Sequence, residues 1–209
     1  MHSTQIALGE IAALIDIATI IPYVWSTLKG HTRPSRASYG IWAVIQTVGL
    51  ISYIAAGATT TIWALCVLTF NAFVIFGLSF KYGMGGRNKF DIPCLLLAGV
   101  AIFLWITTDN PALAVYLSTF AGFIGYLPTI KKAYLWPDTE NILSWSMYVV
   151  AATLNGCALT SLRPAIALPP LCGLGLSVIV TSLLIFPHWK LMKVPRKHYN
   201  SAISETRLV

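Results

Sequence analysis

The sequence predicts an all-α integral membrane protein. We expect seven transmembrane helices, arranged as a three-helix unit, a linker helix and a second three-helix unit in the same orientation (3+1+3). The prediction rests on composition, on uncharged runs and on an internal repeat. The 209 residues are 56% hydrophobic and only 10% charged, whereas about 25% is typical of soluble domains. So little charge cannot cover a surface that faces water, so most of the outer surface is expected to face lipid.

The spans follow from stretches without Asp, Glu, Lys or Arg. Crossing the hydrocarbon takes about 20 residues of helix, and the uncharged run 37–80 is long enough for two helices that meet near residues 57–60. The first expected span, 6–28, is apolar and is broken only by Glu10 and Asp16. The uncharged spans that follow are 37–56, 61–80, 92–108, 111–130, 141–162 and 164–187. Helices are expected because they satisfy their own backbone groups where no water is present.

The basic residues predict the orientation. All 14 lysines and arginines except Arg163 lie in the connections after spans 1, 3 and 5 or beyond span 7. Short basic connections stay on the cytoplasmic side. We therefore expect an outside amino terminus, a cytoplasmic carboxyl terminus and a place in the plasma (inner) membrane. The net charge of +7 follows from this bias, so nucleic acid is not an expected partner and membrane lipid is.

Two prolines mark an internal repeat. Pro22 and Pro128 lie 106 positions apart, and the same offset pairs Ser38 with Ser144. It also pairs Tyr39 with Trp145, Trp42 with Tyr148, and Thr47 with Thr153. A run of matches at constant offset indicates duplication. The predicted divisions are repeat 1 at 5–82, a linker helix at 83–110, repeat 2 at 111–189 and a cytoplasmic tail at 190–209.

Residues at equivalent repeat positions have expected structural roles. Ser38 and Ser144 are interpreted as N-caps, because a serine oxygen can accept from an orphan amide of the first turn. Pro22 and Pro128 each remove a backbone donor late in a helix. One membrane proline can be a static kink, but two at equivalent positions favour a working hinge.

The segments 22–38 and 128–144 resemble the SWEET and PQ-loop (MtN3-like) superfamily of seven-helix transporters, as a divergent member. Each contains a proline near the end of a first helix, a basic loop and a following serine. Asn71 and Asn155 resemble the asparagines of SWEET helices. Two departures leave the solute open: Tyr23 and Thr129 replace the glutamine after the proline, and the asparagine of the last helix is missing.

Strong polar groups inside the spans are the candidate site residues. Asp16 is costly in hydrocarbon, by about 2.5–3.5 kcal/mol on insertion scales. It is therefore a candidate cavity carboxylate for proton coupling, unless it lies close enough to the outer headgroups to stay wet. The candidate substrate-binding residues are Trp42, Gln46, Asn71, Tyr148 and Asn155. Interhelical hydrogen bonding remains the alternative role for the amides.

Enzyme motifs are missing. The sequence contains no His-Glu-x-x-His, no P-loop glycine pattern and no nucleophile elbow. His2, His31, His188 and His198 lie in termini or loops, so no metal site, cofactor or catalytic residue is predicted. Retinal binding would need a lysine in the last span, and 164–187 has none.

These observations favour a carrier for a small polar or neutral solute, sugar-like or amino-acid-like. Alternating access would come from rocking the two units about the proline hinges. The alternatives are a non-transporting receptor or scaffold, and a vitamin facilitator of nicotinamide riboside type with a similar fold. The partners expected are therefore a small-molecule solute and lipid, with a homo-oligomer left open.

Overall fold

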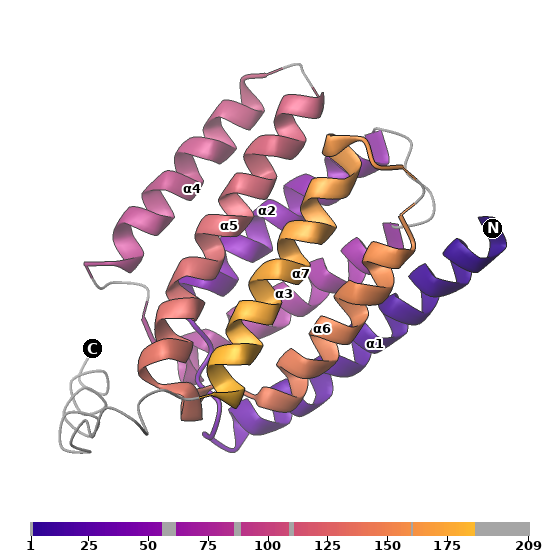
Figure 1. Ribbon diagram of the computed structural model, residues 1–209. Coiled ribbons are helices and arrows are strands. Elements are labelled where there is room, and N and C mark those ends of the chain that lie inside the picture. The colour runs from indigo at the N-terminus through magenta and orange to yellow at the C-terminus, as the bar shows by residue number, and fades with distance from the viewer. Residues whose placement is uncertain (1, 56–61, 86–88, 109–110, 160, 187–209) are drawn as a thin grey trace.

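The computed structural model describes residues 2–55, 62–85, 89–108, 111–159 and 161–186 (Figure 1). Seven α-helices and one short 3-10 turn make up this part of the chain. They are α1 (His2–Leu28), α2 (Arg36–Ala55), α3 (Ile62–Tyr82), α4 (Asp91–Ile106), α5 (Pro111–Leu135), η1 (Pro137–Thr139), α6 (Ile142–Cys157) and α7 (Pro164–Ile185). The all-helical class and the seven helices are therefore confirmed. The predicted tail, 190–209, lies outside the described residues.

The helices differ in how well they suit a membrane. By length and composition, three contain segments that could cross one: Thr4–Leu28, Leu65–Tyr82 and Ile166–Ile185. Apolar segments in α4 and α6 are shorter, Asp91–Leu104 and Ile142–Cys157. In addition, α5 continues five residues beyond the predicted span end at Ile130, so Lys131 and Lys132 belong to the helix and not to the loop.

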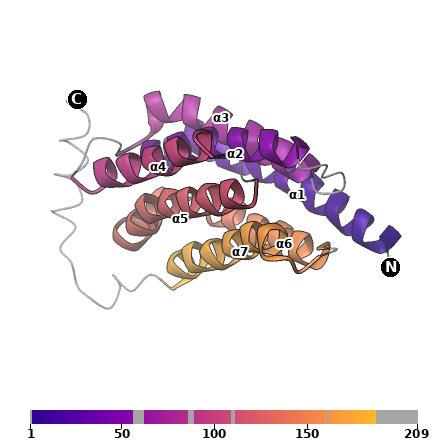
Figure 2. The same cartoon turned by 90° about the horizontal axis from the view of Figure 1, so that it is seen from above.

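The helices form two layers (Figure 2). In one layer α3 packs against both α1 and α2, and in the other α7 packs against both α5 and α6. The layers meet through α1 with α6 and through α2 with α5. The remaining helix, α4, packs mainly on α5. The first helix of each three-helix segment thus contacts the second helix of the other.

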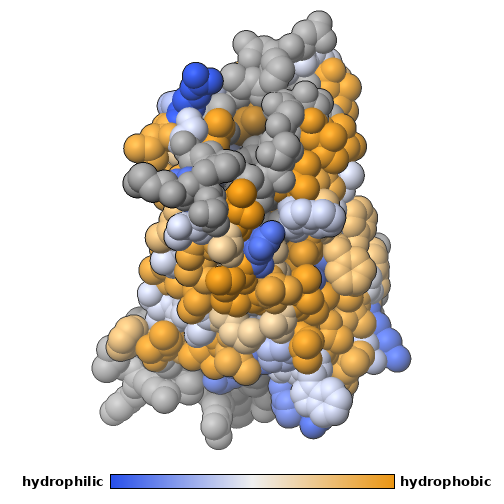
Figure 3. Space-filling view, turned by 90° about the vertical axis from the view of Figure 1, so that its right-hand side faces the viewer, coloured by the Kyte–Doolittle hydropathy of each residue, from blue (hydrophilic) through white to orange (hydrophobic). Residues whose placement is uncertain are grey.

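The outer surface is apolar. On α1 the exposed positions Ile11, Leu14, Ile17, Ile21 and Trp25 are 47–67% accessible and recur every three or four residues, which places them on one helix face. The opposite face, with Ala12, Ala13, Asp16 and Tyr23, is buried. Figure 3 shows hydrophobic side chains over most of one side of the molecule. Contiguous apolar areas of this extent are rare on soluble monomers.

Connections carrying the basic residues meet at one end of the bundle, the lower end in Figure 1. The backbone amide of Arg33, between α1 and α2, donates to the carbonyl of Thr139, between α5 and α6, at 2.9 Å. The amide of Arg36 donates to the carbonyl of Met84, just after α3, also at 2.9 Å. The first bond ties the two layers together, and the second ties the start of α2 to the end of α3 within one layer.

The N-cap assignments were wrong by three residues. Asn141, not Ser144, is the N-cap of α6, and its Oδ1 accepts from the Ser144 amide at 2.8 Å. In the other unit Ser35 Oγ accepts from the Ser38 amide at 3.3 Å. Each predicted cap is in fact the N3 residue that donates to the cap. Ser35 and Asn141 are themselves 106 positions apart, so the offset of the caps is unchanged.

Candidate functional site

A cavity of about 300 Å³ lies between the two layers. Residues of α1, α2 and α3 line one side, and residues of α5, α6 and α7 line the other. It extends along much of the bundle, from Tyr23 and Ser144 near the end that carries the basic connections to Leu159 and Ile166 near the opposite end. A cavity of this size can hold a small ligand, at the lower limit of the usual range of about 300–1,000 Å³.

All six residues predicted to face a central site line this cavity: Asp16, Trp42, Gln46, Asn71, Tyr148 and Asn155. They come from four helices, α1, α2, α3 and α6, so no local sequence pattern brings them together; the packing of the layers does. Asp16 is only 3% exposed. Its side chain therefore faces the cavity and not the outer surface of the bundle.

Five of these six residues carry a buried polar atom without a hydrogen-bond partner among the described residues. The atoms are Asp16 Oδ1, Trp42 Nε1, Gln46 Oε1, Asn71 Oδ1 and Asn155 Oδ1. Buried polar groups are nearly always satisfied, and an orphan one costs about 1–3 kcal/mol. Several around one cavity indicate a place for a polar ligand or for water.

Asn71 and Asp16 are held together by their own hydrogen bonds. Asn71 Nδ2 donates to the Asp16 backbone carbonyl at 2.9 Å, and Thr19 Oγ1 donates to the same carbonyl at 2.7 Å. The bond fixes the Asn71 amide, because a reversed amide would place two acceptors against each other. The interhelical role predicted as the alternative for Asn71 is thus real, but it uses only the nitrogen and leaves the oxygen unpartnered.

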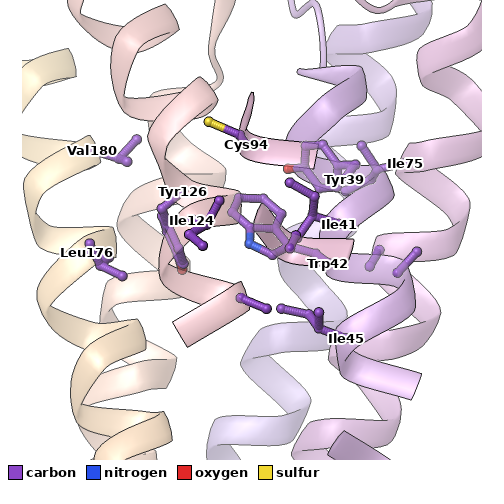
Figure 4. Close-up of a cluster of buried hydrophobic side chains, with 14 of the residues drawn as sticks. Tyr39, Ile41, Trp42, Ile45, Ile75, Cys94, Ile124, Tyr126, Leu176 and Val180 are labelled. Carbon is purple, nitrogen blue, oxygen red and sulfur yellow. The ribbon is translucent and has the colours of Figure 1, made fainter. Parts of the chain in front are cut away.

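Seven aromatic side chains also line the cavity: Tyr23, Tyr39, Trp42, Phe123, Tyr126, Trp145 and Tyr148. Figure 4 shows Trp42 near Tyr39 and Tyr126. The ring centroid of Trp42 lies 5.0 Å from that of Tyr39 and 4.8 Å from that of Tyr126. Two pairs are almost perpendicular, Tyr39 with Trp42 at 85° and Trp145 with Tyr148 at 86°. Rings at such angles form walls around a space, not a stack.

Close helix contact positions Trp42. A Cβ placed on Gly125 of α5 would lie 2.7 Å from Trp42 Nε1 and 3.0 Å from its Cδ1. Gly122, one turn earlier, would bring a Cβ to 3.2 Å from Ile45 Cδ1. The packing role expected for small residues therefore holds at these positions, where α2 lies directly against α5.

The cavity is closed toward the basic connections by a buried ion pair. Lys132 Nζ lies 2.5 Å from Glu140 Oε1, and Lys132 also donates to the backbone carbonyl of Arg33 from the other layer. The second carboxylate oxygen, Glu140 Oε2, accepts from Tyr23 Oη at 3.1 Å and from Trp145 Nε1 at 3.0 Å. Tyr23 belongs to α1, so Glu140 joins both layers at this end.

The predicted hinges lie outside the cavity wall. Pro22 is inside α1 and Pro128 is inside α5, each in the half nearer the basic connections. The Pro22 carbonyl accepts from Asn141 Nδ2 at 3.3 Å. Beside Pro128, Thr129 Oγ1 donates to Ser38 Oγ at 2.8 Å. Each proline therefore sits next to a hydrogen bond that joins the two layers.

Sequence reasoning missed several site residues. Tyr39 and Trp145 were paired by the repeat but not assigned to the site, although both aromatic pairs at the 106-residue offset line the cavity. Lys132 was counted only as a loop charge, yet it is 3% exposed. Pro169 and Pro170, inside α7, also line the cavity. Nothing in the spacing of Lys132 and Glu140 distinguishes them from other charges near a helix end.

The fold and the cavity define a helical bundle with a chamber lined by polar and aromatic side chains between two layers. Among the described residues no group of three or more His, Cys, Asp or Glu could hold a metal ion. No family model, curated protein or solved structure matches this chain. The side chains that line the chamber are therefore the basis for assigning its chemistry.

Proposed function

We propose that this chain is an integral membrane carrier, a divergent relative of the SWEET and PQ-loop transporters, that moves a small polar solute through the central cavity. The observation that carries the proposal is the set of unpartnered polar atoms around a cavity between two helical layers. An apolar exterior supports the membrane part. A polar chamber inside an apolar shell is the arrangement expected of a transport protein.

Orientation follows from the basic residues. We infer that the end holding the α1–α2, α3–α4 and α5–α6 connections faces the cytoplasm of the plasma (inner) membrane, with the amino terminus outside. The hydrogen bonds between Arg33 and Thr139 and between Arg36 and Met84 support this inference, because they gather the basic connections at one end.

We infer that the two layers work as parallel repeats, with α4 as the linker. Two structural facts support this. The helix neighbours correspond, α3 between α1 and α2 and α7 between α5 and α6. The N-caps Ser35 and Asn141 also correspond at the offset of the two prolines. Rocking of such units would expose the cavity to one side and then to the other.

The Lys132–Glu140 pair would act in this cycle as the closure on the cytoplasmic side. Glu140 bonds to α1 through Tyr23, and Lys132 bonds to the α1–α2 connection through the Arg33 carbonyl. Opening the cavity toward the cytoplasm requires these contacts to separate. The neighbouring hinges Pro22 and Pro128 are suited to absorb the movement, since a proline leaves one helix hydrogen bond unmade.

A second candidate, the vitamin facilitator of nicotinamide riboside type, gains support from the aromatic lining. Seven aromatic residues line the cavity, whereas the sequence alone identified two of them as site residues. A flat heterocycle could lie against such walls. The receptor or scaffold alternative gains no comparable support from the described residues.

The experiment is uptake by proteoliposomes containing the purified chain. A panel of labelled sugars, amino acids and nicotinamide riboside separates the candidates. Saturable uptake of one solute class, inhibited by unlabelled solute, is expected. Uptake equal to that of protein-free liposomes for every member, together with tight binding of a cytoplasmic protein, would favour the scaffold instead.

A further inference from the structure

We propose that the solute taken by this cavity is a small organic cation with a protonated amine. The inference rests on the proposed function, in that the bound molecule is the transported one. It is carried by the acceptor-rich lining, by the single lining carboxylate and by the aromatic walls, which are three separate properties of the same cavity.

The hydrogen-bonding capacity of the cavity is unbalanced. Among the buried, unpartnered atoms of the predicted site residues, four are acceptor oxygens: Asp16 Oδ1, Gln46 Oε1, Asn71 Oδ1 and Asn155 Oδ1. One, Trp42 Nε1, is a donor. The Asn71 oxygen is fixed in place by the bond that its nitrogen makes, and a carboxylate has acceptors only. A ligand that satisfies these four oxygens must supply N–H or O–H donors.

The formal charges of the residues that line the cavity also favour a cationic ligand. Asp16 lines the cavity, and no lysine, arginine or histidine of the described residues does. The ion pair at the closed end is already neutral as a pair, because Lys132 and Glu140 satisfy each other. A buried carboxylate is stabilised by an opposite charge, and an isolated one is costly. An anionic solute would face Asp16 without compensation, whereas a cation would pair with it.

The aromatic residues of the cavity wall also favour a cationic ligand. Asp16 of α1 lines the same cavity as Tyr126 of α5 and Tyr148 of α6. The carboxylate of one layer therefore faces the aromatic residues of the other across the cavity. Ring faces attract cations, most strongly those of tryptophan, and aromatic side chains around a binding site are a common means of recognising ammonium groups.

Binding to the full-length protein in detergent micelles tests this with a series of similar shape. The series is protonated 2-(dimethylamino)ethanol, choline and the uncharged 3,3-dimethylbutan-1-ol, with NaCl as the inorganic cation. We expect the protonated amine to bind at least about tenfold more tightly than the alcohol, corresponding to the roughly 1–2 kcal/mol of a desolvated cation–π contact. Choline, which has no N–H, should fall between them.

Asp16→Asn keeps the shape and removes the charge. This variant should lose at least about tenfold in affinity for the amine and retain its affinity for the alcohol, because only the charge term is removed. The matched control is Glu10→Gln, which removes an exposed carboxylate from the same helix. Trp42→Phe, with a smaller ring, should weaken binding of the amine more than binding of the alcohol. This second variant tests the inference if Asp16→Asn fails to fold.

The outcomes separate the inference from the proposed function. Three results would overturn the inference that the ligand is an organic cation: equal affinity for amine and alcohol, tighter binding of the alcohol, or binding of NaCl alone. Each of them would leave the proposal of a carrier for neutral solutes intact. Selective amine binding supports the inference. If that binding is present and the liposomes show no amine uptake, the carrier function fails and the recognition site stands.

Discussion

Lys132 of α5 and Glu140, just before α6, form an ion pair with side chains only 4% and 0% exposed. Both charges have left water, so each depends on the other for stabilisation. The pair lies where the two layers meet, and it is shared with Tyr23 and with the Arg33 carbonyl. It therefore couples the closed end of the cavity to the packing of the layers.

Removing one member of this pair should destabilise the protein. Lys132→Met leaves Glu140 buried and unpaired, at an expected cost of about 3–5 kcal/mol in the free energy of unfolding. The double variant with Glu140→Gln should recover part of that loss. Unfolding in detergent micelles measures both. The control is Lys131→Met, whose ammonium lies 4.2 Å from the Phe90 ring centroid and whose loss should cost about 1 kcal/mol at most. Equal effects of the two lysine variants would contradict the coupling.

The N-cap residue of α6 in the structure differs from the one expected from the sequence. Asn141→Ala removes the acceptor for the Ser144 amide and should cost about 0.5–2 kcal/mol of stability. Ser144→Ala should be close to neutral, since Ser144 Oγ is buried and has no partner among the described residues. Thermal unfolding of the two variants ranks them. A larger loss for Ser144→Ala would restore the original assignment.

Two glycines of the α3 region should respond in opposite ways to alanine. A Cβ at Gly83 would lie 2.4 Å from the Ser79 carbonyl oxygen and 2.7 Å from that of Pro34, both rigid backbone atoms. Gly83→Ala should therefore destabilise by about 1–3 kcal/mol, as overpacking does. At Gly77, inside the helix, nothing lies within 4 Å of a Cβ, so alanine should stabilise by about 0.5–1 kcal/mol. Melting temperatures that move together would refute the packing described for Gly83.

Gly125→Ala tests whether Trp42 belongs to the binding site. The new methyl group would displace the indole, and uptake affinity should fall about tenfold, which corresponds to about 1.4 kcal/mol of binding free energy. Gly122→Ala meets only the flexible end of Ile45 and should have a much smaller effect. The Michaelis constant for uptake measures the difference. An unchanged constant in Gly125→Ala, with normal folding, would remove Trp42 from the site.

Proton coupling through Asp16 predicts a pH phenotype. The charged or titratable groups near it are the hydroxyls of Tyr126 and Tyr148, so Asp16 is the group in the cavity that could exchange a proton during transport. Asp16→Asn should retain measurable uptake that no longer varies with pH. Uptake by this variant that keeps the pH dependence of the unaltered protein would exclude the coupling.

Much of the fold could be predicted because hydrophobic length and charge are local properties. Uncharged runs predicted six of the helices, and an apolar segment broken only by Glu10 and Asp16 predicted the first. The six predicted site residues line one cavity because strong polar groups have few favourable places in an apolar chain. Two features needed three-dimensional contacts. Lys132 and Glu140 are ordinary charges in the sequence, and only the approach of the two layers buries them. The shift from Ser144 to Asn141 reflects where α6 begins, which depends on the η1 turn before it.

The central claim is that one cavity serves both sides of a membrane in turn, and Cys172 offers the most direct test. Cys172 lines the cavity, and the other cysteines, Cys66, Cys94 and Cys157, can be replaced by serine. The measurement is labelling of Cys172 by a membrane-impermeant thiosulfonate, applied to right-side-out and to inside-out vesicles. We predict labelling from both sides, with protection by the transported solute. Labelling from one side only, unaffected by solute, would contradict the account.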